Sequence, residues 1–265
     1  MDVYGIVLAA GIIGATGLLI GILLGVAGKA FAVKVDEKEI AVRAVLPGNN
    51  CGGCGFAGCD ALAKAIANGE APTNGCPVAG AEKAKEIAAI MGVSGGDSKK
   101  MVAYVKCSGS CDKTERKYHY YGVADCRAAK PVPGSGDKAC AYGCMGFGSC
   151  VSECAFDAIH IVNGVAVVDK EKCVSCGKCI KACPNSLIEL VPYDASAAVA
   201  CSSGEKGKDV KAVCDVGCIG CGICAKQCSS EAITVENNVA HIDQSRCTGC
   251  GACVAKCPQK IIKVH

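Results

Sequence analysis

Four cysteines fall within eleven residues in the segment CIGCGICAKQC at 218–228. Three thiols spaced three residues apart can hold three corners of one compact iron–sulfur cube, and in bacterial ferredoxins the fourth cysteine of such a run ligates the neighbouring cluster. Tetrahedral zinc sites instead take two cysteine pairs from separated knuckles. The spacing therefore indicates [4Fe–4S] chemistry, and it requires a second run with which ligands are exchanged.

The sequence supplies three more runs. CVSCGKCIKACP at 173–184 and CTGCGACVAKCP at 247–258 fit the ferredoxin pattern fully, whereas CAYGCMGFGSCVSEC at 140–154 has wider spacing. Crossed ligation between paired runs predicts four cubes. The predicted ligand sets are Cys140, Cys144, Cys150 and Cys183; Cys173, Cys176, Cys179 and Cys154; Cys218, Cys221, Cys224 and Cys257; and Cys247, Cys250, Cys253 and Cys228.

The segments between the paired runs are copies of one another. AFDAIHIVNGVAVVDKEK at 155–172 aligns without a gap with SSEAITVENNVAHIDQSR at 229–246. Each copy alternates apolar and polar residues around an Asn-Gly or Asn-Asn pair, which predicts a β-hairpin. The simplest account is an internal duplication of a two-cluster module.

A fifth cysteine set lies closer to the N-terminus, in LPGNNCGGCGFAGCDALAKAIANGEAPTNGCP at 46–77. Its glycines allow backbone N–H groups to approach cluster sulfurs, which favours [4Fe–4S] over zinc. Asp60 is a candidate N-cap for the alanine-rich helix that follows. The predicted ligands are Cys51, Cys54, Cys59 and Cys76.

Five cysteines remain: Cys107, Cys111, Cys126, Cys201 and Cys214. They are either free or buried thiols, which behave as small apolar residues, or a further ligand set. The duplication suggests that Cys107 and Cys126 precede the first module as Cys201 and Cys214 precede the second. Those four thiols would hold a sixth cube and leave Cys111 spare.

The composition agrees with cluster binding. The chain has 25 cysteines among 265 residues but no tryptophan and only four phenylalanines, so it cannot build a large apolar core. An odd number of cysteines in tight runs is unlike a disulfide framework. The formal net charge of +3 comes from scattered residues and predicts no nucleic-acid partner. We find no dinucleotide fingerprint and no nucleophile–base pair, so we expect no bond-making catalytic residue here.

The chain begins with an apolar segment. From Val3 to Gly28 there are 26 residues without a charge, enough to cross a membrane. A secretory signal would have a positive n-region and a shorter apolar stretch. Lys29 and Lys34 follow the segment, which predicts a single-pass helix in the cell membrane with the remaining chain in the cytoplasm. Glycines at 17, 21 and 25 line one face, where another membrane helix could pack closely.

We therefore expect an α+β protein with an N-terminal transmembrane helix, a small helical [4Fe–4S] domain and two tandem dicluster ferredoxin-like modules. The predicted ranges are 1–30 for the membrane helix, 31–91 for the helical domain, 92–137 for a linker or cysteine-containing insert, 138–191 for the first module, 192–211 for a linker and 212–265 for the second module.

The order of these parts resembles the B subunit of the Rnf ion-translocating ferredoxin:NAD oxidoreductase complex, in an extended form with a duplicated module. The resemblance rests on the uncharged N-terminal segment, CGGCGFAGC at 51–59, YYGVADCRAA at 120–129 and the ferredoxin runs. It implies a subunit that accepts electrons from reduced ferredoxin and passes them to other membrane subunits, coupled to Na⁺ or H⁺ export. The alternatives are a membrane-anchored polyferredoxin that serves a hydrogenase or a redox-regulator-reducing system, and a zinc-stabilised interaction protein.

Overall fold

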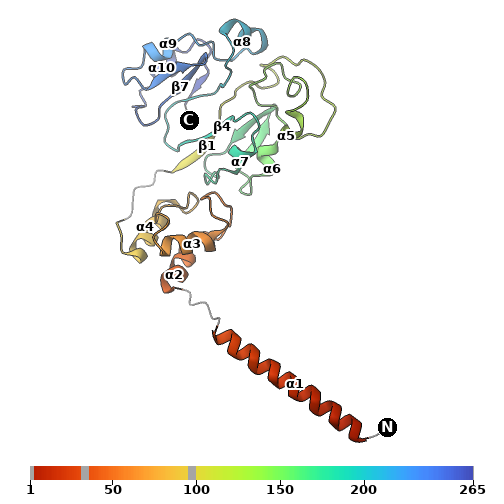
Figure 1. Cartoon of the computed structure of the whole chain (residues 1–265). Helices are drawn as coiled ribbons and strands as arrows, with labels where there is room; N and C mark the ends of the chain where they lie inside the picture. Colours follow the sequence, from red (N-terminus) through yellow and green to blue (C-terminus); the bar gives the residue numbers. More distant parts are fainter. Residues whose placement is uncertain (1–2, 31–35, 95–99, 265) are drawn as a thin grey trace.

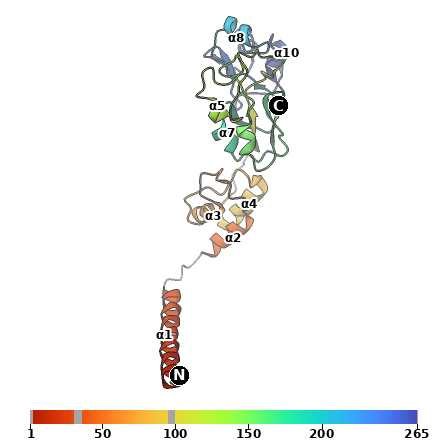
Figure 2. The same cartoon turned by 90° about the vertical axis from the view of Figure 1, so that its right-hand side faces the viewer.

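The computed structural model describes residues 3–30, 36–94 and 100–264. Figure 1 shows three parts that follow one another along the chain: helix α1, a small helical domain, and two modules that contain the strands. The view from the side in Figure 2 shows the same succession. The mixture of helices and paired strands confirms the α+β class.

Helix α1 (Val3–Ala30) is the long apolar helix that the composition predicts. Its segment Gly11–Lys29 is long and apolar enough to cross a membrane, and none of that segment is buried against the rest of the chain. Apolar side chains such as Ile13 and Leu24 are exposed all round the helix. A helix with no polar face is suited to lipid or to other membrane helices as its surroundings. Lys34, the second of the two flanking lysines, lies outside the described residues.

The helical domain consists of α2 (Glu37–Val45), α3 (Cys59–Ala67) and α4 (Gly80–Met91). Its core is built by Val42, Leu62, Ile66 and Ile87, all of which are fully buried. The expected N-cap role of Asp60 is wrong. Asp60 forms an ion pair with Arg43, and the amide of Cys59 donates instead to Asn50 Oδ1 at 2.8 Å.

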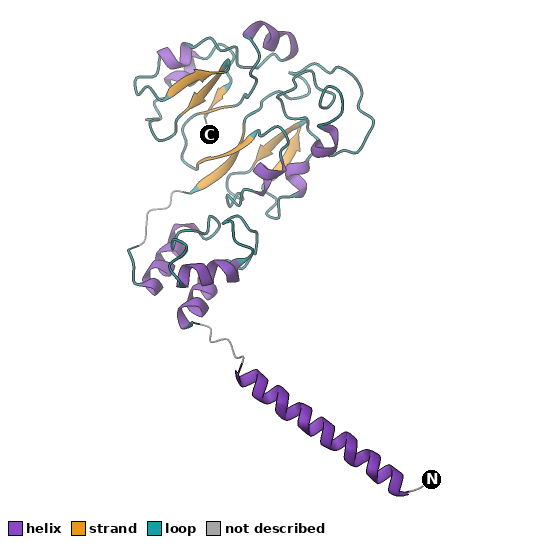
Figure 3. Cartoon of the chain, viewed as in Figure 1, coloured by secondary structure: helices purple, strands orange, loops and turns teal. Residues whose placement is uncertain are grey.

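The two modules repeat one pattern of paired strands and short helices (Figure 3). In the first module β1 (Met101–Val105) pairs with β4 (Ile188–Pro192) and β2 (Ile159–Val162) with β3 (Val165–Val168). In the second module β5 (Ala198–Val199) pairs with β8 (Ile262–Lys263) and β6 (Ile233–Glu236) with β7 (Val239–Ile242). All four pairs are antiparallel. The helices are α5 (Cys126–Ala129), α6 (Ser149–Ser152), α7 (Lys178–Ala182), α8 (Gly207–Val213), α9 (Ile223–Lys226) and α10 (Ala252–Lys256).

Strands β1 and β5 correct the expected module boundaries. Both lie in segments, 92–137 and 192–211, that the sequence predicted as an insert and a linker. Each strand instead pairs with the last strand of its own module, β1 with β4 and β5 with β8. The strands are short and nearly continuous in apolar residues, so no alternation of apolar and polar positions distinguishes them from other buried segments.

Both predicted hairpins form. The turn residues Asn163 and Gly164 have φ angles of 46° and 74°, and Asn237 and Asn238 have φ angles of 48° and 63°. Two consecutive positive φ values define the type I′ turn that matches the twist of paired strands. A loop glycine in each module lies against this turn: a Cβ atom at Gly220 would be 2.8 Å from the backbone oxygen of Asn238. The corresponding distance from Gly146 to Gly164 is 2.6 Å.

This contact predicts different results for two neighbouring substitutions, Gly220→Ala and Gly222→Ala. Both residues have positive φ, so either change costs about 1–2 kcal/mol of backbone strain. Only Gly220→Ala adds an overlap with the turn, because nothing lies within 4 Å of the Cβ position at Gly222. We expect the melting temperature, followed by circular dichroism, to fall more for Gly220→Ala. Equal losses would contradict the close packing of loop and turn.

Candidate iron–sulfur sites

Two cavities in the modules are each lined by four cysteines in the crossed arrangement. One takes three cysteines from a single run and the fourth from its partner: Cys173, Cys176, Cys179 and Cys154. The other repeats this in the second module: Cys218, Cys221, Cys224 and Cys257. The crossed arrangement is the one in which the last thiol of a ferredoxin run completes the neighbouring site.

A third cavity differs from the expected set. It is lined by Cys126, Cys144, Cys150 and Cys183, so Cys126 stands where the sequence predicted Cys140. The reason emerges when 140–154 is aligned with 214–228, which requires no gap. Cys144 and Cys150 then correspond to Cys218 and Cys224, but Phe147 occupies the position of Cys221. The first module lacks this middle cysteine, and Cys126 supplies the missing thiol from the preceding segment.

Phe147 contributes to holding that segment in place. Its ring lies 5.0 Å from the ring of Tyr120. Both rings pack on a small core formed by Cys126, Ala129 and Met145. The wider spacing of the 140–154 run therefore arises because a phenylalanine stands at the position of a cysteine, with no residue inserted.

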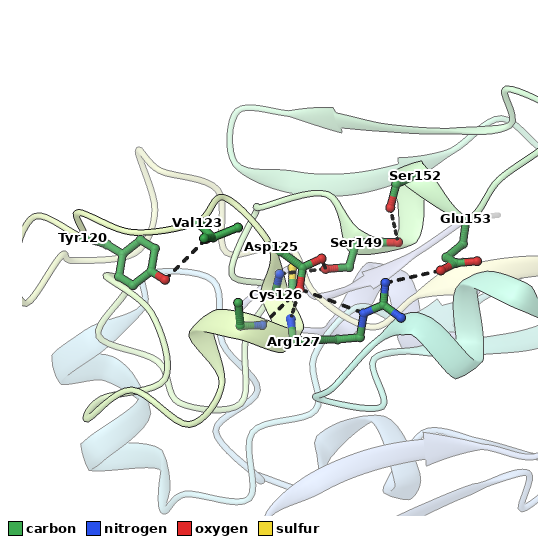
Figure 4. Close-up of polar contacts among 9 residues, drawn as sticks. Tyr120, Val123, Asp125, Cys126, Arg127, Ser149, Ser152 and Glu153 are labelled. Atoms are coloured by element: carbon green, nitrogen blue, oxygen red, sulfur yellow. Dashed lines mark hydrogen bonds and ion pairs between the residues drawn. The ribbon is translucent and has the colours of Figure 1, made fainter.

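Figure 4 shows how α5, the short helix that begins at Cys126, is attached to α6. Asp125 caps α5 by accepting from the amides of Arg127 and Ala128. The Cys126 amide donates to Ser149 Oγ at 2.7 Å, and Ser149 Oγ donates to Asp125 Oδ2 at 2.7 Å. This hydrogen bond from Ser149 is the main reason that the pKa of Asp125 lies below its usual value. Ser149, which is 2% exposed, corresponds to Ile223 in the other module.

We predict that Ser149→Ala destabilises the site that contains Cys126. The buried amide of Cys126 would lose its acceptor, at a cost of about 1–3 kcal/mol. Anaerobic protein challenged with an iron chelator should lose about four irons, one cluster, faster than the wild type. Ser152→Ala is the matched control, since Ser152 belongs to the same helix and, among the described residues, its hydroxyl donates only to the Ser149 carbonyl. Identical kinetics for both variants would contradict the anchoring role.

The remaining predicted sets also lie close together. In the helical domain Cys59 is part of the core, and Cys54 and Cys76 pack against it. In the second module Cys253 is buried, and the charges of Cys247 and Cys250 act on it. Cys228, which follows α9, accepts a hydrogen bond from the amide of Ala232 at 3.3 Å.

Backbone amides point at several ligand sulfurs. The amides of Ala103, Ala158 and Leu187 donate to Cys173, Cys154 and Cys183, each at 3.4 Å. Amide donors of this kind stabilise negative charge on thiolate sulfur, and in iron–sulfur proteins they tune the reduction potential. The first of these bonds comes from β1, so the strand outside the expected boundary contributes directly to the site.

Several buried thiols are poor thiolates in the protein alone. Burial, with a smaller contribution from the charge of the neighbouring Cys144, raises the pKa of Cys150 to about 12. Burial likewise raises the pKa of Cys179 and of Cys224 to about 11. Cluster binding needs deprotonated thiols, so loading with iron must release protons.

The donor geometry suits a cube better than a single ion. Among the described residues, no three His, Cys, Asp or Glu side chains form a group that could hold one metal ion. Four thiols around a common cavity fit a cofactor that carries an iron at each corner. The residues present therefore fit [4Fe–4S] clusters.

The helical domain and the first module touch beside two of these sites. A Cβ atom at Gly53 would lie 2.6 Å from the backbone oxygen of Cys176. The charge of Cys51 also raises the pKa of Cys176, although burial is the larger cause. Gly53 thus lets the loop that carries Cys51 and Cys54 approach the loop that carries Cys176.

We predict that Gly53→Ala separates these two loops. The added methyl group overlaps the Cys176 backbone, while Gly55→Ala, the control, meets nothing within 4 Å and imposes only backbone strain at a φ of 88°. In the fully reduced protein, the magnetic interaction between the two clusters should weaken for Gly53→Ala in EPR spectra. If Gly55→Ala changes the spectrum equally, the contact is not what sets the separation.

The five remaining cysteines divide differently from the predicted sixth set. A further cavity is lined by Cys107, Cys201 and Cys214 together with Cys140, so Cys126 and Cys140 exchange places relative to the expectation. The sequence indicates that Cys140 and Cys214 are equivalent, because Cys140 precedes Cys144 by four residues, as Cys214 precedes Cys218. Cys111 lies apart, and its sulfur accepts from the Arg116 guanidinium at 3.3 Å.

Comparisons with known families agree with iron–sulfur binding. Residues 46–78 match a family model described as a putative Fe-S cluster domain, residues 166–189 a 4Fe-4S binding domain, and residues 217–261 a 4Fe-4S dicluster domain. The chain therefore belongs to the class of multi-cluster iron–sulfur proteins, and its N-terminal helix is a candidate membrane anchor.

Three curated relatives define the family more narrowly. The B subunit of the Na(+)-translocating ferredoxin:NAD(+) oxidoreductase complex of Acetobacterium woodii is 49% identical, covering 91% of this chain and 72% of the relative. The B subunit of the ion-translocating oxidoreductase complex of Methanosarcina acetivorans is 45% identical over 94% of both. The B subunit of the proton-translocating ferredoxin:NAD(+) oxidoreductase complex of Clostridium ljungdahlii is 42% identical, covering 86% and 81%. The chain belongs to the family of Rnf B subunits.

Proposed function

We propose that this chain is the iron–sulfur electron-transfer subunit of an ion-translocating ferredoxin:NAD oxidoreductase complex. It accepts electrons from reduced ferredoxin and relays them through [4Fe–4S] clusters to the other membrane subunits. Five sites carry the relay. Their ligands are Cys51, Cys54, Cys59 and Cys76; Cys154, Cys173, Cys176 and Cys179; Cys126, Cys144, Cys150 and Cys183; Cys218, Cys221, Cys224 and Cys257; and Cys228, Cys247, Cys250 and Cys253.

The observation that carries this proposal is how close the cysteine-lined sites lie to one another, from the helical domain to the first module and within each module. Gly53 brings the site in the helical domain against Cys176 of the first module. Cys150 and Cys179, which belong to different sites of that module, pack in one apolar core. In the second module Cys224 and Cys253 share a core in the same way. Redox sites that lie this close together are suited to electron relay.

The chain's own residues bind, bury and orient the cofactors. When bound, the clusters supply the one-electron redox chemistry. Apolar burial and amide donors such as that of Ala103 determine how much negative charge each site tolerates. The subunit takes part in redox catalysis without forming or breaking a covalent bond of the substrate, so NAD and flavin belong on other subunits.

The membrane helix sets the position of the relay. Lys29 lies in the last turn of α1. Since positive residues favour the cytoplasmic side, the clusters lie in the cytoplasm, where reduced ferredoxin is available. Gly17, Gly21 and Gly25 offer a close-packing face for helices of the other membrane subunits. The names of the relatives include both Na⁺ and proton translocation, so similarity alone does not choose the coupling ion.

We predict that the full-length protein oxidises reduced ferredoxin. Mixing the two anaerobically should bleach the visible cluster absorbance of the subunit while ferredoxin becomes oxidised. Protein from which the clusters have been stripped by a chelator is the control. Membranes lacking the subunit should lose ferredoxin-dependent NAD reduction and regain it with the wild-type chain. Clusters that dithionite reduces but ferredoxin does not, with NAD reduction unaffected by deletion, would contradict the proposal.

A further inference from the structure

One cysteine-lined cavity has no place in the five-site relay. It lies between the two modules and is lined by one thiol from each of four separate segments. These are Cys107, Cys140, Cys201 and Cys214. Burial raises the pKa of Cys107, Cys140 and Cys201. Burial of cysteines as small apolar residues does not explain why two thiols from each half of a duplicated protein meet in one cavity.

The four thiols form two equivalent pairs in the internal duplication. Cys140 and Cys214 occupy the same position of the gap-free alignment, four residues before Cys144 and Cys218. Cys107 and Cys201 each follow, by two residues, the last residue of the first strand of their module, β1 and β5. Each module therefore contributes the same two positions to the cavity. A fully ligated site arises only when both modules are present.

The hydrogen bonds that backbone amides donate to these sulfurs are also equivalent in the two modules. The Cys144 amide donates to Cys107 Sγ at 3.3 Å, and the Cys218 amide donates to Cys201 Sγ at 3.3 Å. The Thr114 hydroxyl lies 3.6 Å from Cys214 Sγ. Sulfurs that receive such hydrogen bonds resemble those at the other sites, where amide donors stabilise thiolate charge.

Two further groups at the cavity indicate an anionic occupant. The Ser108 hydroxyl is buried and has no hydrogen-bond partner among the described residues, although it lines the cavity. Lys138, which is 5% exposed, also lines it. Its ammonium donates to the carbonyls of Gly109 and Gly164, and within the described ranges it forms no ion pair. A buried cation beside four thiols and an unpaired hydroxyl is satisfied by a cluster whose thiolates and sulfides carry net negative charge.

We propose that Cys107, Cys140, Cys201 and Cys214 hold a sixth [4Fe–4S] cluster that connects the two ferredoxin-like modules. The proposal rests on the proposed function, because it takes the other five cysteine sets as cluster sites. Four thiols around one cavity, with amide hydrogen bonds to Cys107 and Cys201, resemble the donor sets of the sites that contain Cys154 and Cys183. Among the described residues, no three His, Cys, Asp or Glu side chains are placed to hold a single metal ion.

The position of the sixth site explains how electrons pass between modules. Cys144 is a ligand of the nearest site in the first module, and Cys218 is a ligand of the nearest site in the second. The amides of both residues donate directly to sulfurs of the sixth site. One hydrogen bond therefore separates the sixth site from a ligand residue of its neighbour on each side. The site is the link that makes two dicluster modules one relay.

Single substitutions test whether these thiols bind iron. Cys201→Ala in the full-length protein, purified anaerobically, should contain about four irons fewer per chain than the wild type. Cys111→Ala is the matched control and should leave the iron content unchanged, since Cys111 pairs with Arg116 outside the cavity. Full iron content in Cys201→Ala would overturn the sixth cluster and leave the assignment of the other five sites unaffected.

Double substitutions test which thiols share a cluster. Cys140→Ala combined with Cys201→Ala removes two ligands of one site and should again lose about four irons. Cys126→Ala combined with Cys201→Ala strikes two sites and should lose about eight. The reverse result would assign Cys126 instead of Cys140 to the cavity between the modules and overturn the proposed ligand set.

A measurement on the unmodified protein removes any dependence on folding of the variants. Native mass spectrometry of the anaerobic, cluster-loaded chain should give a highest state with six clusters. A highest state with five clusters would overturn the sixth site while supporting the other five as cluster sites. A protein without iron and sulfide would overturn the proposed function itself, so the two failures are distinguishable. An EPR signal that disappears in Cys201→Ala but persists in Cys111→Ala would identify the sixth cluster among the others.

Discussion

The constraint on which this structure depends is the mutual repulsion of several thiolates in one small buried space. Burial is the main cause, and the proximity of other cysteines the second, of a pKa of about 12 for Cys150. Only a cofactor with positive metal centres makes such a collection of ligands favourable. Large apolar side chains are scarce, and the cores that exist consist partly of ligand cysteines such as Cys144, Cys224 and Cys253. The clusters are therefore structural cross-links as well as redox centres, and loss of one should loosen its module.

Duplication and divergence together account for the arrangement of sites. The second module retains three thiols in its first run, whereas the first module has Phe147 in place of the middle cysteine and Ser149 in place of Ile223. Both changes help to position the segment that carries Cys126: Phe147 packs near Tyr120, and Ser149 accepts a hydrogen bond from the amide of Cys126. The positions that did not diverge, Cys140 with Cys214 and Cys107 with Cys201, meet at the junction of the two modules.

The features that depend on local spacing, namely the cysteine runs and the hairpin turns, could be predicted from the sequence. Three thiols in one run reach one cube, and an Asn-Gly pair between alternating strands forms a hairpin, so the crossed pairs at Cys154 and Cys257 and both turns were accessible without a structure. The exchange of Cys126 and Cys140 could not be predicted in this way, because a ligand that comes from a separate segment leaves no spacing pattern in the run. The gap-free alignment of 140–154 with 214–228 contained the missing signal, since it places a phenylalanine where a ligand belongs. Strands β1 and β5 were not predicted for another reason. They pair with strands at the far end of their modules, and a short apolar segment does not indicate which strand it pairs with.

Metal analysis of the anaerobically purified protein tests whether this family member works as a chain of [4Fe–4S] clusters. Iron, acid-labile sulfide and zinc should be measured on one sample against protein concentration. We expect iron and sulfide in equal amounts, about 24 of each per chain when every site is filled, with negligible zinc. Stoichiometric zinc without labile sulfide would contradict the electron relay and every conclusion drawn from it.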